Sequence, residues 1–207
     1  MSFFEDLPSP PQRPRMPKLV PPVWAAPPSD ELPAVVSVGE FLQRTPRLVM
    51  AVKCVEVFST GCVIELVWTV RREDETDSEW ALVTEQCFNR PAFRHGIPVG
   101  GDGGLRFGVA YPDGRKATED GMRPWGSEET GPDGPVLTPA SGGGGGGSDE
   151  ELSYSAKFWV WPLPSGGDLR VVAQWPDRGM DERSVPVSGA ALAAAAGEIR
   201  KYWDSVD

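Results

Sequence analysis

The residues best suited to bind a ligand are tryptophans in the segment KFWVWPLP, residues 157–164. In a strand, alternate side chains point to opposite faces, so Trp159 and Trp161 share one face and the apolar residues between them share the other. Exposed aromatic rings stack on sugars and on aromatic ligands. Trp159 and Trp161, together with Trp24, therefore form a candidate ligand or partner surface.

The chain itself can also cover this tryptophan face. Two apolar segments are available for that purpose: a C-terminal helix with Ile199 and Trp203 on its apolar stripe, and an N-terminal arm that carries Val23 and Trp24. The stripe of the helix has to be buried against some surface, and a strand with two apolar faces offers one. We expect the chain to cover the face that Trp159 occupies.

Catalytic residues are not evident in the sequence. His95 is the only histidine, so any Ser-His-Asp or Cys-His arrangement would need it. It lies in the loop-like segment FRHG, where Cys87 is the nearest thiol, and no GxSxG motif is present. The 30 acidic residues can supply a carboxylate pair for glycoside hydrolysis, but nothing singles out one pair. The sequence predicts no enzyme, and a hydrolase with unidentified carboxylates is a third hypothesis.

Metal and cofactor motifs are also missing. One histidine and the scattered Cys54, Cys62 and Cys87 provide no ligand spacing, and no CxxC motif occurs. The glycine-rich segment VGGDGGLRFG, residues 99–108, lacks the Lys-Ser or Lys-Thr of a P-loop and does not fit GxGxxG. We predict no cofactor and no metal. The cysteines are expected to be small buried thiols, the alternatives being a Cys54–Cys62 bridge or a reactive Cys87.

The charge of the chain argues against several partners. It carries 20 basic and 30 acidic residues, a formal net charge of −10. Nucleic acids and anionic membrane surfaces are bound mainly through Lys and Arg, so neither is an expected partner, whereas a basic protein surface is. No apolar run approaches the ~20 residues of a membrane span, and the first residues do not resemble a secretory signal. We expect a cytoplasmic protein.

The elements that must position these residues are mostly short strands. Residues 47–58 and 62–72 are rich in β-branched residues and flank Ser59-Thr60-Gly61, which predicts a hairpin. The second run also alternates in polarity, whereas Lys53 and Glu56 interrupt the first. Further strands are predicted within residues 105–111, 152–163 and 168–175. Residues 77–90 change to helical spacing after a cap at Ser78 or Asp77. The pattern predicts an all-β fold, an antiparallel β-sandwich (immunoglobulin-like or an open barrel) with a short internal helix and a C-terminal helix.

The sequence divides into an arm and one domain. Residues 1–33 hold ten of the 22 prolines and are predicted to be an extended arm, either a linker or a ligand for an aromatic groove through its Pro-x-x-Pro spacings. Residues 34–207 form the predicted sandwich domain. Within it we expect a flexible glycine-rich loop at about 116–150, which includes six consecutive glycines, and a helix at about 188–203 that Ser188 caps.

The string FWVWPLP, followed by GDLRVVAQWPDRGM and an alanine-rich helix ending in KYW, resembles an uncharacterised family of cytosolic proteins from GC-rich bacteria. That resemblance implies a bacterial origin and carries no known activity. From the residues, the first hypothesis is a non-enzymatic protein–protein interaction or assembly module, with the acidic surface, arm and loop as contact regions. The alternative is a carbohydrate or small aromatic ligand-binding module that uses Trp159 and Trp161.

Overall fold

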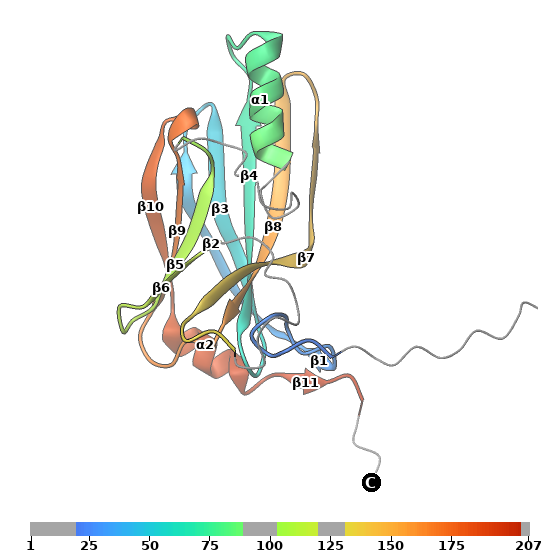
Figure 1. Ribbon diagram of the computed structural model, residues 1–207, viewed down its shortest axis with the longest axis vertical. Coiled ribbons are helices and arrows are strands. Elements are labelled where there is room, and N and C mark those ends of the chain that lie inside the picture. Colours follow the sequence, from blue (N-terminus) through green and yellow to red (C-terminus); the bar gives the residue numbers. More distant parts are fainter. Residues whose placement is uncertain (1–19, 89–102, 120–130, 204–207) are drawn as a thin grey trace, which may run out of the picture.

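A computed structural model describes residues 20–88, 103–119 and 131–203. The predicted all-β sandwich is confirmed: two antiparallel sheets face each other and two helices lie at their ends (Figure 1). The larger sheet has the order β2 (Ala34–Arg44), β3 (Leu48–Val57), β4 (Cys62–Arg71), β8 (Glu151–Trp161) and β7 (Val136–Gly147). The smaller has the order β10 (Met180–Val187), β9 (Leu169–Trp175), β5 (Arg106–Ala110) and β6 (Lys116–Thr118).

The core lies between the two sheets. The inward side chains of β4 are Cys62, Ile64, Leu66, Trp68 and Val70, each at most 2% exposed, as their alternation predicts. Aromatic side chains join the layers, because the Phe107 ring of β5 lies 5.2 Å from that of Phe158 and 5.6 Å from that of Trp68, centroid to centroid. Because of this packing, the face of β8 that carries Phe158 points toward the core.

The sheets also approach each other at both margins. On one side a single parallel bridge joins Glu119, after β6, to Leu137 of β7. On the other side β10 packs beside β2. Strand β2 is irregular near its middle: Gly39 has a φ of 69°, and the register with β3 shifts between Ser37 and Glu40. This register shift agrees with the left-handed conformation that glycine tolerates.

Helix α1 (Asp77–Phe88) confirms the predicted internal helix, but its cap is one residue earlier than expected. The Thr76 hydroxyl accepts the Glu79 backbone N–H at 3.3 Å, and the Glu79 carboxylate accepts the Thr76 N–H at 2.8 Å. This reciprocal pair is a capping box and replaces the Ser78 or Asp77 cap. Trp80, Val83 and Cys87 are buried, at the predicted helical spacing.

Helix α2 (Gly189–Ala196) is shorter than the predicted helix of 188–203. Ser188 caps it as predicted, since its hydroxyl accepts the Ala191 N–H at 3.3 Å. After Gly197 the chain instead forms β11 (Arg200–Lys201), which pairs with β1 (Glu31–Leu32). Pairing with β1 outweighs the helical pattern there, and Trp203 is 80% exposed instead of buried on a helical stripe.

The predicted loop at about 116–150 is wrong for much of its length. Strand β6 begins at Lys116, and β7 runs from Val136 through all six glycines to Gly147. Glycine is a poor strand former in isolation, but pairing with the long neighbouring strand β8 orders this segment. Among the described residues, no helix is long and apolar enough to cross a membrane.

Candidate functional site

Trp159 is fully buried, on the face of the larger sheet opposite the main core. It forms a small cluster with Phe58 and Val63, against which Ala140 and Trp161 pack. The Phe58 ring meets the indole edge-on, with centroids 5.8 Å apart and an interplanar angle of 77°. A Cβ added at Gly61 would lie 2.6 Å from the Trp159 ring, so the indole packs against the β3–β4 turn. No ring surface of Trp159 is open to a ligand.

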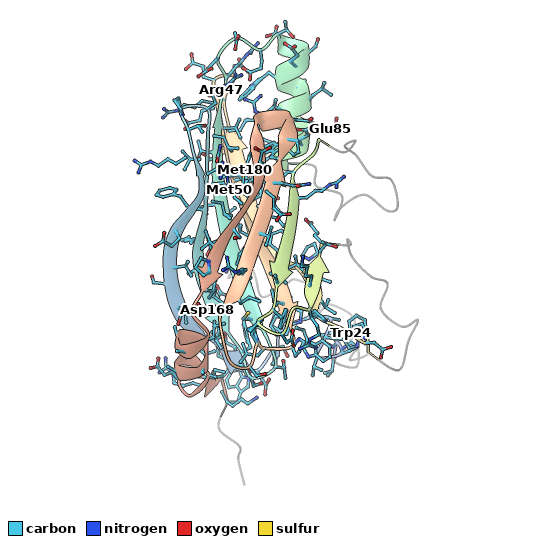
Figure 2. All side chains as sticks on the ribbon, turned by 90° about the vertical axis from the view of Figure 1, so that its left-hand side faces the viewer. Trp24, Arg47, Met50, Glu85, Asp168 and Met180 are labelled. Atoms are coloured by element: carbon cyan, nitrogen blue, oxygen red, sulfur yellow. The ribbon has the colours of Figure 1, made fainter. Side chains whose placement is uncertain are left out.

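The other two tryptophans of the predicted surface are half-buried. Trp161 joins the Trp159 cluster, whereas Trp24 packs on Gly131, where an added Cβ would lie 2.7 Å from the indole Cδ1. Figure 2 places Trp24 at the end of the molecule that carries α2, opposite Arg47. As expected, the chain covers Trp159, but neither of the two predicted covers takes part among the described residues. The buried Leu192 and Ala195 of α2 belong to the main core, and Val23 and Trp24 of the arm are not in the Trp159 cluster.

Unpaired polar atoms surround the Trp159 cluster. The indole N–H of Trp159 and the hydroxyls of Thr138 and Thr60 are buried without a hydrogen-bond partner in the part of the chain that the structure describes. Thr138 lies directly opposite Trp159 in the β7–β8 register. Buried hydroxyls of this kind cost stability, because they lose water and gain no bond.

Charged side chains lie near the middle of the same sheet face. Lys53 donates to Glu65 at 2.9 Å, and Lys157 donates to Glu56 at 2.5 Å. Burial alone would raise the pKa of Glu65, but hydrogen bonds from Lys53 and Cys54 lower it below its ordinary value. Burial and the adjacent Glu65 raise the pKa of the Cys54 thiol. The carboxylates are engaged as ion-pair partners, and Cys54 is not an activated nucleophile.

A second charged group ties the two sheets together at the end where α1 begins. The Glu75 carboxylate accepts from Arg47 at 2.6 Å, from Arg178 at 2.7 Å and from the Glu73 N–H at 2.8 Å. Arg178 lies in the short 3-10 helix η2 (Pro176–Arg178), between β9 and β10. Burial alone would raise the pKa of Glu75, but the hydrogen bonds outweigh it and hold the pKa at about 2. Glu75 thus joins the loop before α1 to the smaller sheet.

A third carboxylate joins the chain segments at the other end. Glu31 is 3% exposed and accepts from the Ser59 hydroxyl at 2.6 Å, the Ser59 N–H at 2.9 Å and Lys201 at 3.0 Å. Burial alone would raise the pKa of Glu31, but these donors lower it below its ordinary value. Glu31 therefore connects β1, the β3–β4 turn and β11.

The cysteines are all free thiols, so the Cys54–Cys62 bridge is not formed, and a reactive Cys87 is not supported because that side chain is buried. Cys62 is buried, which raises the pKa of its thiol to about 12. Cys87 is buried in α1 and its sulfur accepts the Trp68 indole N–H at 3.2 Å. His95 lies outside the described residues. No group of three or more His, Cys, Asp or Glu side chains that could hold a metal occurs in residues 20–88, 103–119 and 131–203.

The open edge of β7 is the feature that sequence reasoning missed. Gly144–Gly147 pair with residues 152–155 of β8, and the turn closes where the Ser148 N–H donates to the Glu151 carbonyl at 2.8 Å. In an antiparallel pair, hydrogen-bonded and non-hydrogen-bonded positions alternate. Counting from that closing pair, Gly146 and Gly144 bond to β8, whereas the N–H and C=O groups of Gly145 and Gly147 point away from it.

No described strand pairs with the outer side of this segment, since β7 ends the order of its sheet. Residues Ser141–Gly147 are exposed, and Figure 1 shows the upper half of β7 at the margin of the molecule. The low β propensity of glycine predicted a loop, and no signal in the sequence indicated that the run would be paired along one side. We call the segment Gly142–Gly147 the glycine edge.

Strong negative charge lies at the end of the glycine edge. The turn from β7 to β8 carries the exposed Asp149 and Glu150. The Arg72 N–H donates to the Glu150 carbonyl at 2.8 Å, which places the acidic loop before α1 beside this turn. The side chains of Asp74 in that loop and of Asp77, the first residue of α1, are 89% and 98% exposed.

Comparisons of the chain with protein-family models, with curated proteins and with solved structures found no match in any of the three.

Proposed function

We propose that this chain is a non-enzymatic β-sandwich protein that acts as a protein–protein interaction or assembly module. The observation that carries the proposal is the glycine edge: a strand at the margin of the larger sheet, exposed along Gly142–Gly147 and paired on one side only among the described strands. A cytoplasmic location is the expectation from the sequence.

Uncovered strand edges invite pairing with another chain. Natural proteins usually protect such edges with charged side chains, proline, bulges or a covering element. The glycine edge has one irregularity, where the register with β8 shifts between Ala140 and Gly144. Beyond it, Gly144–Gly147 carry no side chain at all. An edge of this composition supports a role in binding another polypeptide.

The charged and aromatic residues support this proposal more than the alternatives. Glu31, Glu65 and Glu75 each accept hydrogen bonds from neighbouring side chains that hold segments of the fold together. Stacking of a sugar on Trp159 would need its ring to be uncovered, and that ring is 0% exposed. A hydrolase would need carboxylates free to exchange protons with a substrate.

Site-specific photo-crosslinking in cells that produce the protein tests the proposal. A photoreactive amino acid at Gly146 reports on the glycine edge, and one at Ala193, exposed on α2, serves as the matched control. We expect discrete protein adducts from position 146 and none of the same mass from position 193. The same adducts from both positions, or none from 146, would contradict the proposal.

A further inference from the structure

We infer that the glycine edge takes up an extended, basic segment of a partner protein as an additional antiparallel or parallel strand of the larger sheet. The inference rests on the proposed function and adds the binding mode and the chemistry of the partner. It follows from three observations: the direction of the backbone groups, the space beside the glycines and the charge at the end of the strand.

The backbone groups of the glycine edge are arranged for strand addition. Gly145 and Gly147 occupy the positions whose N–H and C=O groups point away from β8, by the alternation that starts at the Ser148–Glu151 pair. They are two residues apart, so their outward groups repeat at the spacing that an incoming strand offers. Main-chain hydrogen bonds of this kind supply the affinity when an extended peptide extends a sheet.

The space beside the glycines separates them into two kinds. A Cβ on Gly145 would lie 2.3 Å from the Ser153 carbonyl oxygen, and one on Gly147 would lie 2.5 Å from that of Glu151. The fold itself requires glycine at these positions. A Cβ on Gly144 or Gly146 would meet nothing within 4 Å, and neither has a positive φ. The fold does not require glycine at these two positions. Because glycine occupies them, the space in which their side chains would stand is left empty, next to the side chains of an incoming strand.

The charge beside the edge selects the kind of partner. Acidic side chains gather where β7 ends and α1 begins: Glu73, Asp74, Asp77, Glu79, Asp149 and Glu150. The nearby Arg47 and Arg72 are already paired with members of this group. A basic segment is therefore attracted to this end. A second copy of the chain, with its own net charge of −10, is repelled.

Titration of the full-length, 15N-labelled protein with short peptides tests the inference. The probe is the capped peptide Lys-Val-Lys-Thr-Lys-Val-Lys, and its counterpart has Glu in place of each Lys. We expect the Lys peptide to shift the amide signals of the glycine edge and to bind at least about tenfold more tightly than the Glu peptide at low salt, with the difference shrinking as salt screens the charges.

Backbone methylation separates strand pairing from simple charge attraction. One further Lys peptide carries an N-methyl group on every residue, and a second carries N-methyl groups on alternate residues only. The fully methylated peptide has no N–H group to donate to Gly145 and Gly147, whereas the second keeps one unmethylated set, so we expect the first to lose binding and the second to keep it. Equal binding by both would overturn strand addition.

Protein variants supply the matched control. Gly144→Lys with Gly146→Lys adds two long cations where the structure has room, so the fold is expected to persist. These side chains should weaken binding of the Lys peptide at least about tenfold, as charges on edge strands do. Ala193→Lys with Ala194→Lys makes the same charge change on exposed positions of α2 and should leave binding unchanged.

The remaining outcomes distinguish this inference from the proposed function. Peptide shifts confined to another surface, with protein adducts still formed from position 146, would overturn the basic strand and leave the interaction module standing. Adducts from position 146 to a second copy of the chain would overturn the basic partner in favour of self-assembly. Absence of adducts from position 146 would contradict the proposed function itself.

Discussion

At the scale of single residues, the Trp159 cluster shows how polar atoms can be buried without a partner. Thr138 is 8% exposed and its hydroxyl has no partner among the described residues. Thr138→Val keeps the shape and removes the hydroxyl. We expect the free energy of unfolding, measured by urea denaturation, to stay level or rise by up to ~1 kcal/mol, because an unsatisfied hydroxyl is destabilising.

Thr45 is the matched control for this substitution. Its hydroxyl donates to the Leu48 carbonyl at 3.2 Å and accepts the Leu48 N–H at 3.0 Å. Thr45→Val should therefore lower the free energy of unfolding by ~1 kcal/mol. A larger loss in Thr138→Val than in Thr45→Val would mean that the Thr138 hydroxyl is hydrogen-bonded in solution.

The Glu75 carboxylate makes the stability of the fold depend on pH. Its pKa falls from an ordinary 4.5 to about 2 in the folded protein. A lowered pKa means that the folded state binds the proton less readily, so the stabilisation is complete above about 4.5 and disappears as the pH falls to about 2. Glu75→Gln should lower stability at pH 7 and flatten the pH dependence in that window.

Thermal unfolding between pH 2 and 7 measures this effect. Glu151→Gln serves as the control, because Glu151 pairs with Arg71 on the surface, where their side chains are 43% and 67% exposed. Exposed pairs contribute little, so this variant should behave like the unmodified protein at pH 7. An unchanged acid dependence in Glu75→Gln would show that Glu75 does not hold the two sheets together.

At the scale of elements, side-chain patterns predicted most strands, through β-branched runs or through alternation, and they failed where side chains are missing. The alternating run of β4 indicates both a strand and its buried face, and the structure agrees at every inward position. The glycines of β7 present no such pattern, so their pairing with β8 was not predictable from propensity. At the C-terminus, the alanine-rich pattern predicted a helix beyond Gly197, but the distant pairing of Arg200 with Leu32 overrides it.

The glycine edge allows a matched comparison between adjacent positions. A Cβ on Gly145 would lie 2.3 Å from the Ser153 oxygen, so Gly145→Ala must displace β8 and should destabilise by about 1–3 kcal/mol. The added Cβ of Gly146→Ala would have no atom within 4 Å, so this variant should be neutral or stabilising by up to ~1 kcal/mol, since alanine lowers the conformational entropy of the unfolded chain. Chemical denaturation of the two variants measures both. Equal effects would mean that β7 does not pair with β8 in the described register.

At the scale of the whole molecule, the sandwich is one core with its two ends secured by separate carboxylates. Three features could be predicted from the sequence, because they depend on local patterns of side chains: the all-β fold class, the hairpin of β3 and β4, and the inward face of β4. The candidate site could not be predicted from the sequence. The glycine edge, the Glu75 cluster and the Glu31 cluster each depend on residues far apart in the chain, such as Glu31 and Lys201. The tertiary fold brings these residues together, and the local pattern of side chains along the chain does not indicate which distant residues will meet.

Removal of β11 tests whether the end secured by Glu31 unfolds separately. A chain that ends at Ile199 loses the pairing of Arg200 with Leu32 and the bond from Lys201 to Glu31. The main core, which includes Leu192 of α2, keeps its contacts. We expect amide hydrogen exchange to speed up at Leu32 and to stay slow at Val171, which is 1% exposed in the middle of β9.

Lys201→Met in the full-length chain separates the two contributions of β11. It removes the bond to Glu31 but keeps the backbone pairing with β1, so exchange at Leu32 should rise less than in the truncated chain. Faster exchange at Val171 in the truncated chain would show that β11 supports the whole sandwich. Slow exchange at both positions would show that Glu31 and Ser59 hold β1 without β11, because the two bonds from Ser59 to Glu31 remain in that chain.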